Sequence, residues 1–158
     1  MEITGIVPMK GNSERVPGKN LRPIAGRPFF EWVLEALIDA RRVDHVFVDT
    51  DSEKIADEVT ARFPDVGIHI RPVELHGDFV PMHDIVAHLA SVLPGDAFLQ
   101  THATNPLLTS ATIEKAIEAY EADEIAEAIA FLIGGNAASI RGAGLGSDGR
   151  ALVRLSTE

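Results

Sequence analysis

The hydrophobic positions of this chain fall into two patterns: short continuous apolar runs, and longer segments in which apolar residues recur every three or four positions. The short runs indicate buried strands and cover residues 3–7, 44–48, 66–70, 97–100 and 151–155. The longer segments indicate helices and cover residues 29–41, 51–63, 83–93, 109–120 and 125–132. Strands that alternate with helices of this length predict an α/β fold, a single three-layer, Rossmann-like domain with a mostly parallel sheet and helices on both faces.

Polar clusters follow four of the predicted strands, at the point where each strand ends. They are the segment from Lys10 to Asn20, the run Asp49 to Ser52, Arg71, and the run Thr101 to Asn105. Ligands of parallel α/β sheets bind at the carboxyl ends of the strands. We therefore expect these four clusters to line one crevice.

The loop after the first strand has a charge opposite to that of the whole protein. The 158-residue chain carries a net charge of −10, whereas residues 10–27 contain five basic side chains and one acidic side chain. Such a basic patch in an acidic protein indicates an anionic ligand. Gly11 would let the backbone approach a phosphate, Asn12 and Ser13 would supply hydrogen bonds, and Lys10 and Lys19 would supply charge. The alternative is an ordinary basic surface loop.

Composition excludes several other classes of function. The chain has no cysteine, so disulfides and thiolate sites are excluded, and its acidic balance disfavours nucleic acid as a partner. No apolar run approaches the roughly 18 residues of a membrane span, and the first residues do not form a signal peptide. We expect a cytoplasmic protein with no membrane partner.

Five motifs, in the same order along the chain, resemble those of the acylneuraminate cytidylyltransferases, which make CMP-sialic acid and related CMP-activated acid sugars. The glycine-containing loop Lys10–Asn20 resembles R-x-x-S-K-G-x-P-x-K-N, and Ala25–Pro28 resembles A-G-K-P. In the remaining three motifs, Val48–Ala56 resembles V-S-T-D-x-E-x-I-A and Arg71–Leu75 resembles R-P-x-E-L. Thr104–Thr109 resembles T-S-P-L-R-T. The resemblance covers residues 1 to about 121.

This resemblance implies a sheet of the nucleotide-diphospho-sugar transferase type and a defined reaction. The anomeric hydroxyl of a 3-deoxy-2-keto acid sugar, such as a sialic acid, would attack the α-phosphate of CTP and release pyrophosphate. Lys10 and Lys19 would be catalytic and would stabilise the charge on the phosphates. The implied nucleotide-binding residues are Lys10, Gly11, Asn12, Ser13, Lys19, Asn20, Arg71, Thr104 and Asn105.

The resemblance also implies Mg²⁺ as a cofactor and a homodimer as a possible assembly. An oxygen-rich Mg²⁺ site needs carboxylates beside the phosphates, and Asp49, Asp51 and Asp78 are the available candidates. A polar aspartate at a strand end is more often a cap or turn residue, so the metal ligands stay unassigned. The family's later metal-binding and dimer-forming segments are not recognisable in this chain.

Four positions depart from the family pattern. Lys10 replaces an arginine, Glu14 and Arg15 replace Lys-Gly, and His102 stands where many members have glutamine. A lysine is a point charge, whereas an arginine offers a two-pronged donor. The acid sugar is therefore left open by the sequence.

The tail, residues 122–158, resembles the C-terminal helix and last strand of short-chain dehydrogenases. That family's glycine-rich dinucleotide loop and Ser-Tyr-Lys set are absent from the chain, so no oxidoreductase activity is expected. We interpret residues 122–158 as a helix and a strand that complete the α/β fold. Two alternatives to an active cytidylyltransferase therefore stay open: a non-catalytic hybrid or truncated nucleotide-binding domain, and an interaction module whose anion is not CTP.

Overall fold

Five strands form one sheet in the computed structural model, which describes residues 1–13, 16–77, 79–122 and 152–154. The strands are β1 (Ile3–Met9), β4 (His45–Thr50), β5 (Gly67–Ile70), β6 (Ala97–Gln100) and β7 (Leu152–Arg154). Their spatial order is β5-β4-β1-β6-β7, in which the first four are parallel and β7 runs antiparallel to β6. The predicted mostly parallel sheet is confirmed, and so is a strand within residues 151–155.

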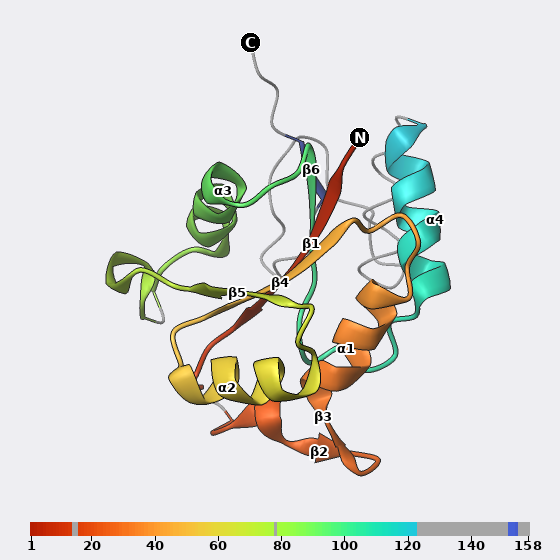
Figure 1. Ribbon diagram of the computed structural model, residues 1–158. Coiled ribbons are helices and arrows are strands. Elements are labelled where there is room, and N and C mark those ends of the chain that lie inside the picture. Colours follow the sequence, from red (N-terminus) through yellow and green to blue (C-terminus); the bar gives the residue numbers. More distant parts are fainter. Residues whose placement is uncertain (14–15, 78, 123–151, 155–158) are drawn as a thin grey trace.

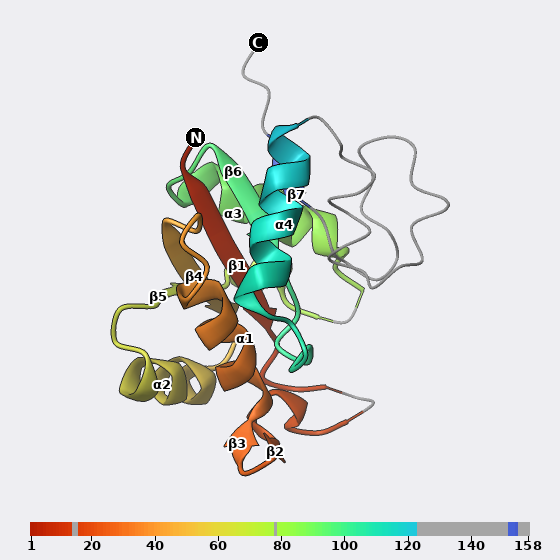
Figure 2. The ribbon, with the colours of Figure 1, turned by 90° about the vertical axis from the view of Figure 1, so that its right-hand side faces the viewer.

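In the part of the chain that the structure describes, four helices cover the two faces of this sheet (Figures 1 and 2). They are α1 (Phe29–Ile38), α2 (Glu53–Arg62), α3 (Met82–Val92) and α4 (Ser110–Glu121). The buried side chains of α1, α2 and α4 join one apolar cluster, and those of α3 join a second. The predicted three-layer arrangement is therefore confirmed, with three helices on one face and α3 on the other.

The central strand β1 separates the two clusters because successive side chains of a strand point to opposite faces. Ile6 packs with Ile85 and Leu89 of α3, whereas its neighbour Val7 belongs to the cluster under α1 and α4. All four side chains are at most 1% exposed. The continuous apolar run in the sequence is thus explained by burial on both faces of the strand.

Hydroxyl side chains cap two of the helices. The Ser52 Oγ accepts a hydrogen bond from the Ile55 amide at 3.4 Å, and the Thr109 Oγ1 accepts one from the Thr112 amide at 3.2 Å. Such caps satisfy amides that have no partner within the helix. Ser52 is therefore the N-cap of α2, and Thr109 is the N-cap of α4.

A small hairpin between the first loop and α1 was not predicted. Strands β2 (Pro23–Ile24) and β3 (Arg27–Pro28) pair antiparallel around a two-residue turn. Ala25 and Gly26 have φ values of 50° and 83°, the double positive φ of a type I′ turn. The proline and glycine content of this segment obscured the short strands. Two 3-10 turns, η1 (Lys19–Leu21) and η2 (Val73–Leu75), complete the described elements.

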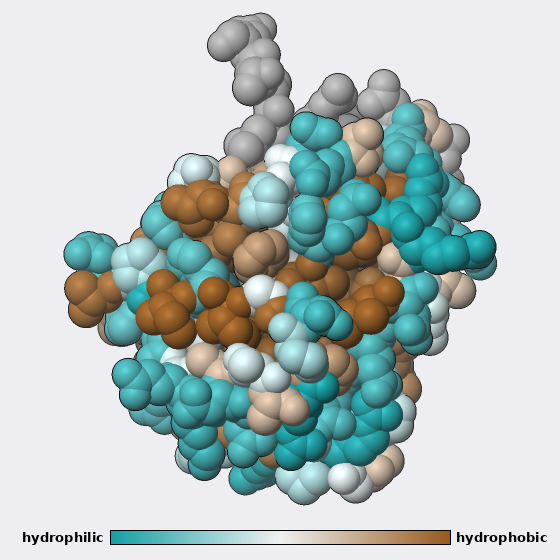
Figure 3. Space-filling model, in the orientation of Figure 1, coloured by the Kyte–Doolittle hydropathy of each residue, from teal (hydrophilic) through white to brown (hydrophobic). Residues whose placement is uncertain are grey.

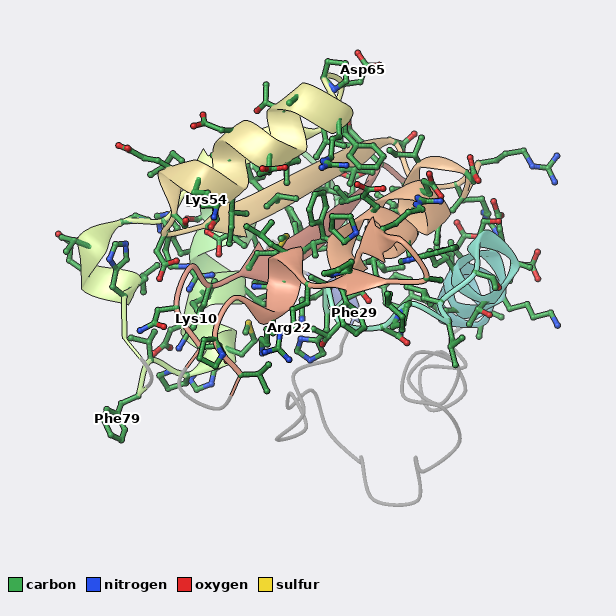
Figure 4. The ribbon with its side chains drawn as sticks, turned by 90° about the horizontal axis from the view of Figure 1, so that it is seen from below. Lys10, Arg22, Phe29, Lys54, Asp65 and Phe79 are labelled. Carbon is green, nitrogen blue, oxygen red and sulfur yellow. The ribbon has the colours of Figure 1, made fainter. Side chains whose placement is uncertain are left out.

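Strand β5 is at the open edge of the sheet, toward the viewer in Figure 1. In the same orientation, Figure 3 shows hydrophobic residues in a band across the middle of the molecule. The exposed apolar side chains of β5 and the segment after it include Ile70 and Val73, and Phe79 is fully exposed and projects from the body in Figure 4.

The helix predicted for residues 125–132 lies outside the described residues. Among the helices that the structure describes, none has the length and apolar character needed to cross a membrane.

Candidate active site

A pocket of about 320 Å³ opens at the carboxyl ends of the parallel strands. Its walls come from four segments: the end of β1 and the loop after it, the residue after β5, the start of α3, and the loop after β6. The lining residues are Pro8, Lys10, Ser13, Lys19, Asn20, Arg71, Met82, His102, Ala103 and Thr104. Figure 4 views the molecule from this end and labels Lys10.

The topology explains why the pocket forms at this position. The chain leaves β1 toward β4 on one side, and it later returns through α3 to β6 on the other side of β1. The connections on the two sides of β1 therefore diverge, which leaves a crevice at the carboxyl end of that strand. The prediction that polar strand ends share one crevice is confirmed for the ends of β1, β5 and β6, whereas the run Asp49 to Ser52 at the end of β4 is not part of the lining.

The loop after β1 is closed on itself by Asn20. The Asn20 side chain is 4% exposed, and its Nδ2 donates to the carbonyl of Lys10 at 2.9 Å. Gly18 adopts a left-handed φ of 63°, and the Lys19 amide donates to the Val16 carbonyl at 3.2 Å. These contacts fix both ends of the loop, so the side chains of Lys10 and Lys19 line the same pocket.

Gly11 anchors the loop to the start of α2. Its amide donates to the Asp51 Oδ1 at 2.6 Å. A Cβ added at Gly11 would lie 2.6 Å from the Ser52 Cβ, so only glycine fits here without a shift of the backbone. Gly11 was expected to bind the nucleotide. Its amide is instead used within the protein, and the close approach that requires glycine is to Ser52.

Lys10 links the loop to the segment that follows β5. Its Nζ donates to the carbonyl of Gly77 at 2.7 Å, so the side chain joins the two segments at the pocket wall. A half-buried ammonium in this position adds positive charge to the pocket wall.

Arg71 forms the deepest cationic part of the wall. It directly follows β5, is 2% exposed, and donates through Nε to the Asp49 Oδ2 at 2.8 Å and through Nη2 to the same oxygen. The Asp49 Oδ1 contacts the His69 Nδ1 at 2.9 Å. Arg71 was expected to act as a cation toward the ligand. Because the charge of Asp49 balances its own, the guanidinium offers the pocket a directed donor more than a net charge.

Of the nine predicted nucleotide-binding residues, the structure brings six together and leaves three outside the lining. Lys10, Ser13, Lys19, Asn20, Arg71 and Thr104 line the pocket. Gly11, Asn12 and Asn105 do not, and the Asn105 amide is used in a turn with the His102 carbonyl at 3.2 Å.

Sequence reasoning missed two lining residues, Pro8 and Met82, and gave His102 and Ala103 no individual role within the run Thr101 to Asn105. Pro8 belongs to β1, which is two residues longer than predicted, so this strand brings a further residue to the pocket. His102 lies in the run that was expected to line the crevice, and it was also noted as a departure from the family pattern. Met82 is the first residue of α3 and follows an irregular stretch, so no local pattern marked it.

The described residues do not fit a Mg²⁺ site. They contain no group of three acidic or histidine side chains close enough to share an ion. Asp49 is engaged by Arg71 and His69, and Asp51 by the Gly11 amide. The third candidate, Asp78, lies outside the described residues.

A second hollow, of about 470 Å³, lies at the amino ends of the strands, where β4 and β5 begin and α1 and α2 end. Its lining includes Phe47, Phe63, Arg62 and Asp65 but no lysine. It is larger than the pocket at the strand ends. It lacks the glycine loop and the convergence of cations, so it is a weaker candidate for binding a phosphate.

Known proteins resemble this chain in sequence and in fold. The chain is 31% identical over 117 residues to the N-acylneuraminate cytidylyltransferase of Oncorhynchus mykiss, an alignment that covers 73% of this chain and 27% of that protein. It is 34% identical over 117 residues to the 3-deoxy-manno-octulosonate cytidylyltransferase of Geobacter sulfurreducens, covering 74% of this chain and 44% of that one. The chain thus spans less than half the length of these two relatives.

Among solved structures, CMP:2-keto-3-deoxy-manno-octonic acid synthetase complexed with CTP superposes with a TM-score of 0.69 at 20% identity. The match covers 78% of this chain and 49% of the other, and supports the nucleotidyltransferase type of fold. The family model described as cytidylyltransferase matches residues 4–134, beyond residue 121, where the resemblance was expected to end. Since that match spans most of the chain, the protein belongs to the cytidylyltransferase family.

Proposed function

We propose that this chain forms the nucleotide-binding part of a CTP-dependent cytidylyltransferase that activates an acid sugar. The observation that carries the proposal is the convergence of Lys10, Lys19 and Arg71 on one pocket at the carboxyl ends of the strands. The charges of two lysines and the directed donor of Arg71, beside a glycine-containing loop, suit a triphosphate, whose negative charge must be balanced during phosphoryl transfer.

In the proposed reaction, the anomeric hydroxyl oxygen of a 3-deoxy-2-keto acid sugar attacks the α-phosphorus of CTP. The new oxygen–phosphorus bond joins the sugar to CMP, and the bond to the bridging oxygen of the β-phosphate breaks. Pyrophosphate leaves with the electron pair, and the hydroxyl proton passes to water. Lys10 and Lys19 hold the triphosphate and stabilise the charge that builds on its oxygens. Ser13, from the loop after β1, and Thr104, from the loop after β6, supply hydrogen bonds.

The acid sugar is proposed only as a class. The relatives quoted above act, by their names, on an N-acylneuraminate and on 3-deoxy-manno-octulosonate, at similar identities of 31% and 34%. Both are 3-deoxy-2-keto acids with an anomeric hydroxyl beside a carboxylate. We assign that shared chemistry to the second substrate.

A non-catalytic nucleotide-binding protein is the second candidate. The observation in its favour is that the described residues provide no ligand set for a metal ion. Mg²⁺ neutralises phosphate charge in most phosphoryl transfers. On this reading the chain binds CTP without turnover.

Titration with CTP, ATP and GTP by calorimetry tests the binding, and release of pyrophosphate tests the reaction. N-acetylneuraminate and 3-deoxy-manno-octulosonate are added separately, with Mg²⁺ present. Lys19→Ala should weaken CTP binding by about tenfold, or about 1.4 kcal/mol. Lys115→Ala is the matched control, because Lys115 is an exposed lysine of α4 outside the pocket lining.

The possible results separate the two candidates. Preferential CTP binding with pyrophosphate release supports the transferase, and CTP binding without release supports the non-catalytic protein. Equal binding of the three nucleotides, unaffected by Lys19→Ala, would refute the CTP site.

A further inference from the structure

A cluster of three side chains lies directly behind the pocket wall, and two of them, Asp49 and Arg71, are buried. Asp49 is the penultimate residue of β4, and His69 is its register partner on β5. Arg71 follows two residues later, and its amide extends the ladder by donating to the Thr50 carbonyl at 2.8 Å. Asp49 is 1% exposed and Arg71 2%, so the carboxylate and the guanidinium are both removed from water.

The carboxylate of Asp49 is divided between its two neighbours. Its Oδ2 accepts both Nε and Nη2 of Arg71, and its Oδ1 contacts the Nδ1 of His69. His69 is held from the other side by His88 of α3, whose ring centroid lies 5.3 Å from its own. A planar guanidinium gripped through two nitrogens cannot rotate, which makes its third nitrogen a donor of fixed direction.

That third nitrogen, Nη1, is buried and has no hydrogen-bond partner among the described residues. Buried hydrogen-bond donors in folded proteins nearly always have an acceptor, so a donor without one needs an explanation. Arg71 lines the pocket, whereas Asp49 and His69 do not. A bound ligand would therefore supply the missing acceptor for Nη1 and would touch Arg71 without touching the residues that hold it.

We propose that Asp49, together with His69, is a positioning residue of the nucleotide site: it holds Arg71 so that Nη1 donates to the bound nucleotide. The role rests on the function proposed above. Asp49 stands at the serine position of the V-S-T-D motif. The contacts of Asp49 with Arg71 and His69 are therefore a feature of this chain's own sequence. Because Asp49 balances the charge of Arg71, the contact provides direction, while Lys19 provides charge.

A double-mutant cycle tests whether Asp49 acts through Arg71. CTP dissociation constants are measured by calorimetry for the wild-type chain, Asp49→Asn, Arg71→Gln and the double variant. We expect each single variant to weaken CTP binding by about tenfold, or about 1.4 kcal/mol. The double variant should bind CTP no more weakly than Arg71→Gln alone, because Asp49 has no guanidinium to hold once Arg71 is replaced.

Two further readouts distinguish positioning from a merely structural role. Arg71→Lys keeps the positive charge but loses the fork, so it should bind CTP as weakly as Arg71→Gln. The loss caused by Asp49→Asn should change little between low and high salt, whereas the loss caused by Lys19→Ala should shrink as salt rises. Full recovery of binding in Arg71→Lys would show that charge alone is needed and would overturn the proposal.

The control is Asp44→Asn, because Asp44 precedes the other end of β4, where its Oδ2 accepts the Ile3 amide at 2.7 Å. It should leave CTP affinity unchanged. If Asp49→Asn does not fold, His69→Gln removes the second holder of the carboxylate and should weaken CTP binding several-fold. The same substitution should have no effect in Arg71→Gln.

The outcomes separate this role from the function on which it rests. A wild-type chain that binds no CTP would refute the proposed function and this role with it. If the wild-type chain binds CTP and folded Asp49→Asn binds it equally well, only the positioning role is refuted. Losses that multiply in the double variant would also refute it, because they would show that Asp49 acts independently of Arg71.

Discussion

The replacement of Gly11 by alanine is the sharpest test of how the phosphate loop is held. Gly11 has no left-handed φ, so alanine can adopt its backbone conformation. The added Cβ would nevertheless lie 2.6 Å from the Ser52 Cβ and 3.3 Å from the Asp51 Oδ1. A Cβ atom cannot swing aside as the end of a long side chain can, so the loop and the start of α2 must move apart.

The expected cost follows from three terms. Overpacking typically costs about 1–3 kcal/mol. Stretching the Gly11 hydrogen bond to the Asp51 carboxylate adds to this, but by less than a buried bond would because the pair is exposed. Alanine also lowers the conformational entropy of the unfolded chain, which stabilises the folded state by about 0.4–1 kcal/mol. We expect a net loss of about 1–2 kcal/mol in the free energy of unfolding and a fall in Tm of about 2–8 °C.

Urea unfolding followed by circular dichroism measures the loss, and a second substitution identifies its cause. Ser52→Gly removes the clashing Cβ and costs only a few tenths of a kcal/mol, because glycine is an acceptable N-cap. The double variant should therefore recover about half of the stability lost by Gly11→Ala. In Gly26→Ala, where no atom lies within 4 Å of the new Cβ, Ser52→Gly should recover nothing.

The loop geometry also makes a prediction about binding. Gly11→Ala should weaken CTP binding by about tenfold, or about 1.4 kcal/mol, because the displaced loop carries Lys10 away from the pocket. Strictly additive stability losses in Gly11→Ala/Ser52→Gly would refute the reasoning, as would unchanged stability and binding in Gly11→Ala.

Three further substitutions test the frame around the site. Gly67→Ala would place a Cβ 2.2 Å from the Phe47 ring and should cost about 1–3 kcal/mol in urea unfolding, a loss that Phe47→Leu should reduce. Thr109→Ala removes the cap of α4 and should cost about 1 kcal/mol, whereas Thr109→Ser should cost little. Glu31→Gln weakens the contacts of a buried carboxylate with two partly exposed arginines, so it should lower stability by about 1 kcal/mol without changing CTP affinity. A change in CTP affinity in Glu31→Gln would contradict the expectation that Glu31 and its two arginine partners contribute to stability alone.

The fold was largely predictable because its elements have clear periodicities. The predicted bounds of the four described helices and the parallel strands agree with the structure to within a few residues. The β2–β3 hairpin was missed because two-residue strands carry no detectable alternation, and because its turn uses Ala25 at positive φ, where glycine or asparagine is usual.

The sequence was enough to predict several residues of the site, but not the side chains with which those residues form hydrogen bonds and ion pairs. Strand ends and the basic loop were enough to bring Lys10, Lys19 and Arg71 together, since parallel strands end at one edge. Contacts between residues far apart in the sequence, such as that of Asp49 with Arg71, depend on side-chain packing that no local pattern encodes. For the same reason, Asp49 was considered as a metal ligand, although the structure shows its carboxylate engaged by two neighbours.

The register of one strand pair connects the fold to the chemistry of the site. Asp49 faces His69 across β4 and β5, and Arg71 lies on the same side of the extended chain two residues later. A slip of β5 by one residue would present Ile70, now 58% exposed, to the carboxylate and would turn Arg71 to the opposite face. Burial of Ile68 against the main core opposes such a slip. The apolar pattern that holds β5 in the sheet therefore also fixes the direction in which Arg71 meets the pocket.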